Sequence, residues 1–243
     1  MLGRNDNKLI IALDVETTSE ARELFAMLRE VTDAFKIGSQ LFTAAGPQFV
    51  RELVRDGARI FLDLKFHDIP NTVAAAGVEA MRLGVFMFNV HASGGSEMMR
   101  RTMDAVGETS EREDLTRPKV IGVTVLTSAD DATLAEIGIA SASEAQVVRL
   151  ARLVEASGLD GVVSSPREIT AVRAAVTLGD FLIVTPGVRQ SNSAKDDQRR
   201  IMTPGDAVRA GADYLVVGRV VLNAPDPQQA AITILDEMTS GLS

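Results

Sequence analysis

The sequence contains no cysteine, no tryptophan and no long apolar run. The lack of cysteine excludes disulfide bonds and thiolate zinc sites, and it fits a cytoplasmic location. A helix that crosses a membrane needs roughly 20 apolar residues in succession, and no stretch approaches that length. The polar residues Met1–Lys8 also lack the apolar centre of a signal peptide. We therefore expect a cytoplasmic protein with no membrane partner.

Positive charge is also scarce. The 25 Lys and Arg residues face 33 Asp and Glu residues, which gives a formal net charge of −8 at pH 7. A negative surface argues against nucleic acid as a partner, so an anionic ligand would need a local cationic site. Hydrophobic residues make up 46% of the 243 residues, which is enough for a large buried core. α/β barrels of this length commonly form one domain.

Short apolar runs alternate with longer amphipathic segments, which is the pattern of repeated strand-helix units. Strands are predicted at Leu9–Asp14, Ala34–Ile37, Ile60–Lys65, Val85–Val90, Val120–Leu126, Gly161–Val163, Leu182–Thr185 and Tyr214–Val217. Helices are predicted at Ser19–Glu30, Phe42–Asp56, Val73–Leu83, Glu97–Val106, Ala145–Ser157 and Pro166–Val176. A further helix opens at Thr203-Pro204, by the cap-then-proline signal, and closes at Gly211. Strand-helix units of this number predict a single-domain α/β fold, a (β/α)8 TIM barrel over residues 1–243.

An open doubly wound sheet is the structural alternative, but no G-x-G-x-x-G turn follows the first predicted strand. Two connections in the predicted barrel are unusual. The charged segment Glu108–Pro118 is expected to be a surface loop with no assigned role. The long polar segment Arg189–Ile201 follows the seventh strand, and a loop of that length in a compact domain is often a lid. We therefore expect residues 189–201 to form a lid loop.

The stretch Asp63–Thr72, with the sequence DLKFHDIPNT, directly follows the apolar run Ile60–Leu62. Successive side chains of a strand alternate between its two faces, so Asp63 and Lys65 are expected side by side on one face. Asp68 follows shortly after, where the strand has ended. Charged residues rarely enter a core unless they are paired or used in chemistry. Two acids and a base at the mouth of a buried strand therefore predict a reactive site.

Polar side chains also follow most of the other predicted strands, and in barrel enzymes the C-terminal ends of the strands form the working face. The residues expected at this rim are Asp14, Lys36, Asp63, Lys65, Asn89, His91, Thr127, Ser128, Arg189 and Arg219. Barrels often bind phosphate between the loops after strands seven and eight, where glycines let backbone N–H groups approach the anion. Gly187 and Gly218 suit that role, and the planar guanidinium of Arg219 suits a phosphate. The sequence therefore favours a phosphorylated substrate.

The two histidines, His67 and His91, do not form a metal-binding pattern. The sequence has neither a His-x-His nor a His-x-x-x-His pair, so spacing predicts no metal site. We expect His67 to help order the loop after the third strand and His91 to form supporting hydrogen bonds.

Several short motifs together resemble those of the orotidine 5′-phosphate decarboxylase family. Besides DLKFHDIPNT they are FKIG around Lys36, HASGG, VTVLTS, TPGVR, QRR at 198–200 and VVGR. They occur in order from Ile10 to Asn223, which is most of the chain. Members of this family are homodimeric barrels that convert orotidine 5′-monophosphate to UMP and CO2, the last step of de novo UMP biosynthesis. They use no metal or organic cofactor, so the resemblance implies the same activity without a cofactor here.

The resemblance also implies a role for each motif residue. Lys65 would donate a proton to C6 of the pyrimidine, and Asp63 would lie near the departing carboxylate. The implied catalytic set is Lys65, Asp63, Lys36 and Asp68. Asp68 and Thr72 would come from the neighbouring subunit of a homodimer. The implied substrate-binding residues are Asp14, Lys36, Thr72, Thr127, Arg189, Gln198, Gly218 and Arg219, of which the last four would hold the phosphate.

Three other functions stay open from the sequence. Related barrels that act on sugar phosphates, such as hexulose-phosphate synthases and keto-gulonate-phosphate decarboxylases, share the Asp-x-Lys-x-x-Asp pattern but use Mg2+. They carry Glu on strand two, where this chain has Lys36, and a cation there disfavours a metal. A barrel that only senses a nucleotide would not need a proton donor such as Lys65. A scaffold role has no supporting sequence feature.

Overall fold

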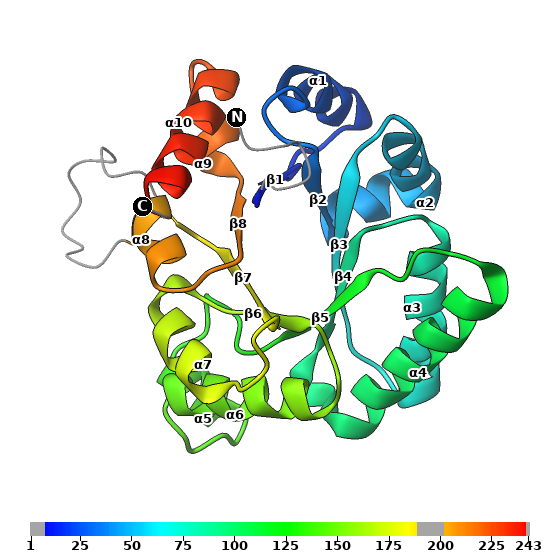
Figure 1. Cartoon of the computed structure of the whole chain (residues 1–243), viewed down its shortest axis with the longest axis vertical. Coiled ribbons are helices and arrows are strands. Elements are labelled where there is room, and N and C mark those ends of the chain that lie inside the picture. Colours follow the sequence, from blue (N-terminus) through cyan, green and yellow to red (C-terminus); the bar gives the residue numbers. More distant parts are fainter. Residues whose placement is uncertain (1–7, 189–201, 242–243) are drawn as a thin grey trace.

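The computed structural model describes residues 8–188 and 202–241. Eight parallel strands form a closed barrel in the order of the chain, with β8 pairing back to β1. The helices surround the strands in a ring (Figure 1). The predicted (β/α)8 architecture is confirmed. An open doubly wound sheet is excluded, because it would leave two strands as unpaired edges.

The strands are β1 (Leu9–Ala12), β2 (Ala34–Gly38), β3 (Arg59–Phe66), β4 (Met87–His91), β5 (Lys119–Val123), β6 (Gly161–Val163), β7 (Leu182–Pro186) and β8 (Tyr214–Val217). They lie where the sequence predicts them, apart from shifts at their ends. The largest shift concerns β5, which was expected to reach Leu126 but ends at Val123. Beyond it, the Thr124 hydroxyl donates to the carbonyl of Val163 at 2.9 Å. The apolar residues Val125 and Leu126 line a cavity instead of continuing the strand.

The α-helices are α1 (Thr18–Leu28), α2 (Ser39–Arg55), α3 (Pro70–Arg82), α4 (Gly95–Glu113), α5 (Asp131–Glu136), α6 (Ser143–Ala156), α7 (Ile169–Ala175), α8 (Pro204–Arg209), α9 (Arg219–Leu222) and α10 (Pro227–Ser240). Two 3-10 turns, η2 (Ala92–Gly94) and η3 (Pro166–Glu168), precede α4 and α7. α8 begins as predicted, because the Thr203 side chain accepts the N–H of Asp206 at 3.1 Å. Gly211 follows its end with a φ of 109°, a conformation that favours glycine.

A separate apolar cluster fills the barrel interior. Its buried residues are Ile10, Ala12, Ala34, Phe61, Met87, Ile121, Val184 and Val216. Their neighbours along the strands belong to the larger core between strands and helices, as the alternation of strand side chains requires. Lys36 and Asp63 each follow a member of the inner cluster, Ala34 and Phe61, by one full period of the strand. They therefore point toward the barrel axis, beyond the apolar layer.

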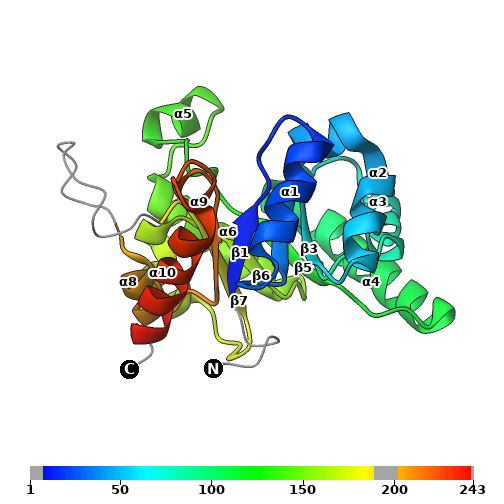
Figure 2. The ribbon, with the colours of Figure 1, turned by 90° about the horizontal axis from the view of Figure 1, so that it is seen from above.

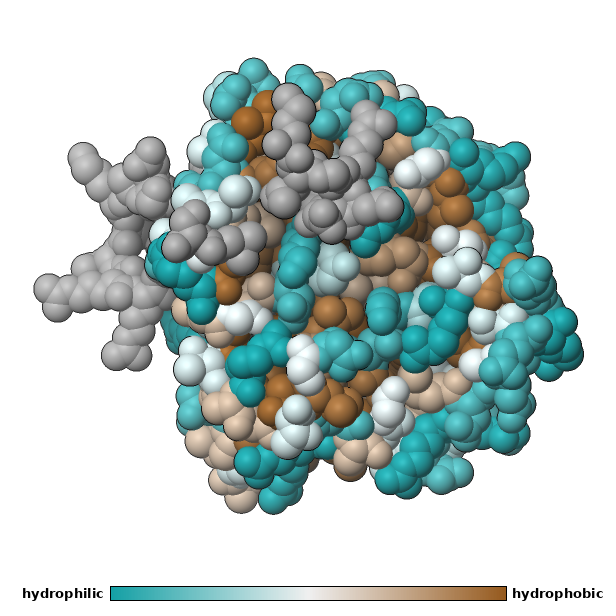
Figure 3. All heavy atoms as spheres, viewed as in Figure 1, coloured by the Kyte–Doolittle hydropathy of each residue, from teal (hydrophilic) through white to brown (hydrophobic). Residues whose placement is uncertain are grey.

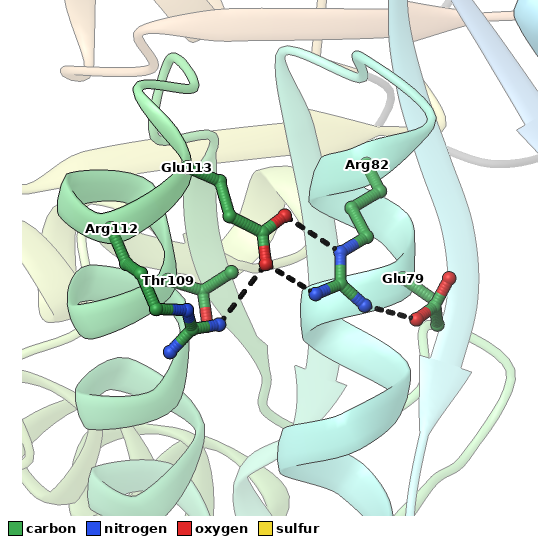
Figure 4. Close-up of polar contacts among 5 residues, drawn as sticks. All are labelled: Glu79, Arg82, Thr109, Arg112 and Glu113. Carbon is green, nitrogen blue, oxygen red and sulfur yellow. Dashed lines mark hydrogen bonds and ion pairs between the residues drawn. The ribbon is translucent and has the colours of Figure 1, made fainter.

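α4 continues to Glu113, so the expectation of a surface loop over Glu108–Pro118 was wrong for its first half. Glu113 accepts two hydrogen bonds from Arg82 of α3, at 2.9 and 2.5 Å (Figure 4). Arg112 donates to the same carboxylate at 3.1 Å, and Arg82 also donates to Glu79 at 2.6 Å. The charged residues that resembled a loop in the sequence therefore join two neighbouring helices.

Figure 2 shows the barrel from the side, so that its two ends can be distinguished. α5 projects from one end, the end where the preceding Leu126 and Thr127 line a cavity. The opposite end faces the viewer in Figure 3, with hydrophobic side chains mainly in its middle and hydrophilic ones around them. No helix within residues 8–188 and 202–241 is long and apolar enough to cross a membrane.

Candidate active site

A cavity of about 740 Å³ opens at the C-terminal ends of the strands. The loop after β1 and the strands β2 and β3 contribute charged lining residues, whereas β5, β6 and β7 with their following loops contribute mostly apolar ones. Because the barrel closes in chain order, these two groups face each other across the mouth. The cavity therefore has a charged wall and an apolar wall, which suits a ligand that carries both kinds of group.

The charged wall is a row of four side chains whose charges alternate. Lys65 Nζ lies 2.6 Å from Asp63 Oδ1. Lys36 Nζ lies 3.4 Å from the other oxygen of Asp63 and 2.9 Å from Asp14 Oδ1. The side chains of Lys36 and Asp63 are 10% and 14% exposed, whereas Lys65 is 36% exposed. Four predicted site residues, from β2, β3 and the loop after β1, are therefore in direct contact, and Lys65 is the more accessible lysine.

Asp63 is held in its ionised form within this row. Burial by itself would raise its pKa, but the positive charges of Lys36 and Lys65 act in the opposite direction. Hydrogen bonds from Lys65 and Asn89 add to their effect, so the pKa of Asp63 lies below its ordinary value of 3.8. A fixed negative charge therefore lies between the two ammonium groups at neutral pH.

Asn89 supports the row, although the sequence analysis assigned it no role. Its side chain donates to Asp63 Oδ1 at 2.7 Å and accepts the backbone N–H of Lys65 at 2.8 Å. The sequence contained one signal for it. Met87, Asn89 and His91 are two residues apart along the strand, so Asn89 lies on the same inner face of β4 as the other two.

Gly38 at the end of β2 is a second residue that sequence reasoning missed. A Cβ at this position would lie 3.2 Å from Lys36 Nζ and 3.3 Å from Asp14 Oδ1. A larger residue would therefore crowd the ion pair between these two side chains. No sequence signal pointed to this role, because the crowding involves another strand.

The apolar wall lies across the mouth from the lysines. Its residues are Val123, Val125, Leu126, Val163 and Pro186. Apolar surroundings exclude water and strengthen electrostatic interactions inside the cavity. A charge that develops between the two walls would therefore interact strongly with the ammonium of Lys65.

The ends of β7 and β8 form the part of the cavity expected to bind phosphate. Gly187, Gly218 and Arg219 all line it, together with Thr127 from the loop after β5. Gly187 has a φ of 82°, the left-handed region that favours glycine. An added Cβ at Gly218 would lie 3.5 Å from the Cβ of Ala12. Accessible backbone beside a guanidinium is suited to an anion.

Two predicted site residues that the structure describes, Asp68 and Thr72, are not brought into this cavity. Asp68 and Thr72 are exposed and are not among the described residues that line it. The Asp68 carboxylate accepts the N–H of Ile69 at 2.6 Å, just before α3 begins. Arg189 and Gln198 lie outside the described residues.

The two histidines contact each other beside the charged row. Their ring centres are 5.3 Å apart. Burial lowers the pKa of His91 below 6.5, electrostatic repulsion from His67 and Lys65 adds to this effect, and Asp63 opposes it. The expected hydrogen bonds of the His91 ring are not found among the described residues. Within the same residues, no group of three or more His, Cys, Asp or Glu side chains could hold a metal ion.

Comparison with known proteins gives one consistent match. Residues 7–234 match the family described as Orotidine 5'-phosphate decarboxylase / HUMPS family. An orotidine 5'-phosphate decarboxylase from Geobacter sulfurreducens is 53% identical over 234 residues, covering 96% of this chain and 97% of that protein. One from Syntrophotalea carbinolica is 51% identical over 242 residues, covering 100% of this chain and 99% of that protein.

Solved structures agree with the sequence relatives. The crystal structure of orotidine 5'-phosphate decarboxylase from Lactobacillus acidophilus matches with a TM-score of 0.83 at 34% identity. The match covers 96% of this chain and 99% of that chain. This chain therefore belongs to the orotidine 5′-phosphate decarboxylase / HUMPS family.

Proposed function

We propose that the protein decarboxylates orotidine 5′-monophosphate to UMP and CO2, with Lys65 as proton donor to C6 and without a metal or organic cofactor. The family match and relatives at 53% and 51% identity make the chain a carboxy-lyase of this type, acting in pyrimidine biosynthesis. The observation that carries the chemical part of the proposal is the contiguous row of Asp14, Lys36, Asp63 and Lys65.

Loss of CO2 breaks the bond between C6 and its carboxylate carbon, and the electron pair of that bond stays on C6. An ammonium held where this charge develops stabilises the transition state and can then supply a proton to the carbon. Lys65 suits both steps, because it is partly open to the cavity and is held 2.6 Å from Asp63. After the transfer Lys65 is a neutral amine, and it regains a proton from water.

The other members of the row would hold the rest of the substrate. Asp63 would lie near the departing carboxylate, and Lys36 would bond the ribose as well as Asp63. Asp14 would hold a ribose hydroxyl, and Thr127 would lie at the pyrimidine edge. The contact of Lys36 with both acids supports these assignments, since it aligns the row along one wall of the cavity.

The phosphate of this substrate is remote from the bond that breaks. Its binding energy can therefore be used to close the site and exclude water. Gly218 and Arg219 are proposed phosphate ligands, and their position in the cavity lining supports this role. Arg189, Gln198 and the lid at 189–201 complete the proposal.

We also propose a cytoplasmic homodimer in which Asp68 and Thr72 reach the neighbouring site. Both residues are exposed, and the cavity lining of their own chain does not include them among the described residues. Ile69, between them, is a large apolar side chain that is 66% exposed. A second copy that covers this segment would bury Ile69, and its active site would receive the carboxylate of Asp68.

The position of Lys36 argues against the Mg2+-dependent sugar-phosphate alternative. Its ammonium lies between Asp14 and Asp63, two carboxylates that could otherwise help to hold a divalent ion. A metal there would face a positive charge at contact distance. A metal-free reaction is therefore favoured.

The proposal is tested by incubating the purified, EDTA-treated protein with orotidine 5′-monophosphate in deuterated water. We expect CO2 release and UMP that carries deuterium at C6. Activity that appears only after Mg2+ is added would favour the sugar-phosphate type of site. A complete lack of UMP under both conditions would refute the proposed reaction.

A further inference from the structure

Asn89 on the inner face of β4 contacts two members of the charged row at once. Its side chain is fully buried, at 0% exposure. Its carbonyl oxygen Oδ1 accepts the backbone N–H of Lys65 at 2.8 Å, and its amide nitrogen Nδ2 donates to Asp63 Oδ1 at 2.7 Å. The same Asp63 oxygen accepts a hydrogen bond from the Lys65 ammonium at 2.6 Å. The three residues therefore form a closed ring of hydrogen bonds around the Lys65 side chain.

The backbone that Asn89 holds is irregular. Regular pairing between β3 and β4 stops after Leu62 and resumes only at Phe66, so β3 uses more residues than its partner over this length. Within this bulge Lys65 has a φ of 54°, the left-handed region that residues other than glycine rarely adopt. Such a conformation persists only where surrounding contacts hold it. The bond between the Lys65 N–H and Asn89 is such a contact.

We propose that Asn89 is a positioning residue for the proton transfer, which fixes the Lys65 backbone in this conformation and directs Asp63 Oδ1 toward the Lys65 ammonium. The inference rests on the proposed function, because Lys65 is the proton donor there. Asn89 acts through its two neighbours and need not touch the substrate. It therefore determines where the ammonium lies relative to a bound pyrimidine.

The two contacts require a side chain with one acceptor and one donor. A backbone N–H can only donate and an ionised carboxylate can only accept, so the group between them must do both. Leucine has a similar shape but offers neither. An ionised aspartate keeps the acceptor but brings a second negative charge against Asp63. A protonated aspartate again has an acceptor and a donor, so it can replace the amide.

The charged groups around this position determine how an introduced carboxyl group would titrate. From β3 the position faces Asp63 and Lys65, and Lys36 of β2 lies 3.4 Å beyond Asp63. On β4 itself His91 follows, and its ring contacts His67. Burial and the charge of Asp63 favour a protonated carboxyl group here, while Lys65 opposes them. An Asp at this position should therefore gain a proton as the pH falls through the mildly acidic range.

The test compares Asn89→Leu and Asn89→Asp with Thr32→Val as a matched control. Thr32 is also buried, and its hydroxyl bonds Leu9 and Ala34 away from the cavity. kcat and KM for orotidine 5′-monophosphate are measured from about pH 5 to 8, together with Tm. We expect Asn89→Leu to lower kcat by about 100-fold with little change in KM. Thr32→Val should lower Tm and leave kcat unchanged.

Asn89→Asp gives the readout that a purely structural role would not produce. Its kcat relative to wild type at the same pH should rise as the pH falls, because the protonated carboxyl group restores the donor. A ratio that stays constant with pH would overturn the proposal. A folded Asn89→Leu protein with kcat within about threefold of wild type would do the same. If Asn89→Leu does not fold, the pH dependence of Asn89→Asp decides alone.

Wild-type activity separates this inference from the proposed function. If the wild type makes no UMP, the proposed reaction has failed, whatever the variants do. The positioning role is then judged from crystal structures of wild type and Asn89→Asp at neutral pH. Unchanged positions of the Lys65 backbone and the Asp63 carboxylate in the variant would refute it.

Discussion

Lys65 and Asp63 show how two single residues divide the electrostatic roles in the cavity. The ammonium of Lys65 is partly exposed and free to approach a ligand, whereas Asp63 is largely buried and keeps its negative charge. A buried carboxylate normally binds a proton more readily. Here two ammonium groups and the amide of Asn89 prevent this, so the charge pattern is fixed before any substrate binds.

Replacing Lys65 by alanine should abolish turnover while the barrel stays folded. No other cation among the described residues could take its place at the exposed end of the row. We expect kcat/KM to fall by far more than tenfold, where each tenfold step is about 1.4 kcal/mol in barrier. Lys119→Ala is a suitable control, because Lys119 is an exposed lysine at the start of β5, away from the cavity, where it pairs with Asp160. A folded Lys65→Ala protein within about tenfold of wild type would disprove the proton-donor role.

Asp63 should make folding stability depend on pH on the acid side. Its folded pKa lies below the ordinary value of 3.8, so between these two values the unfolded chain binds more protons. The stability it contributes is therefore complete above the ordinary value and is lost as the pH falls through the lowered pKa. Denaturant unfolding between about pH 5 and 3 should show a steeper loss for wild type than for Asp63→Asn. Equal slopes would contradict this assignment.

At the scale of elements, the sequence predicted the strands better than the connections between them. Strand positions follow from apolar runs whose side chains alternate between two cores, and each predicted strand is present. The errors at β5 and α4 have a common cause. Val125 and Leu126 are apolar because they line a cavity, and Glu113 is charged because it accepts hydrogen bonds from Arg82 of the neighbouring helix α3. Composition alone cannot distinguish these environments.

The contact between α3 and α4 should contribute to thermal stability. Glu113→Gln removes the charge that Arg82 and Arg112 share (Figure 4). We expect Tm to fall at low salt, with a smaller fall at high salt, because salt screens exposed charges. Glu111→Gln on the same helix is the charge-matched control and should change Tm less. An equal shift for both variants would mean that net charge, and not the ion pair, is responsible.

At the scale of the whole molecule, the cavity of one chain lacks two of its expected residues. Asp68 and Thr72 lie on an exposed segment, so the proposed active site is complete only in a dimer. This arrangement predicts complementation between two inactive variants, Lys65→Ala and Asp68→Ala. In a mixed dimer, one site receives Lys65 from one subunit and Asp68 from the other, while the second site lacks both.

Mixing equal amounts of the two variants, after dissociation and reassociation, should restore about one quarter of the wild-type activity. Half of the dimers would be mixed, and each of these would carry one intact site. Each variant reassociated alone is the control. Activity of the mixture that equals the sum of the separate variants would show that Asp68 does not reach a neighbouring site.

The sequence by itself determined the class of fold and the presence of a reactive site. Both depend on the regular spacing of apolar and charged side chains along a single strand or helix. The alternation that separates the two cores and the spacing of Asp63 and Lys65 are properties of this kind. Only the tertiary structure decided which strands face each other, and thereby joined Lys36, Asp14 and Asp63 into one row. It also decided the role of Asn89. That role depends on a bulge in β3 and on the register of β4, which no local pattern of residues encodes.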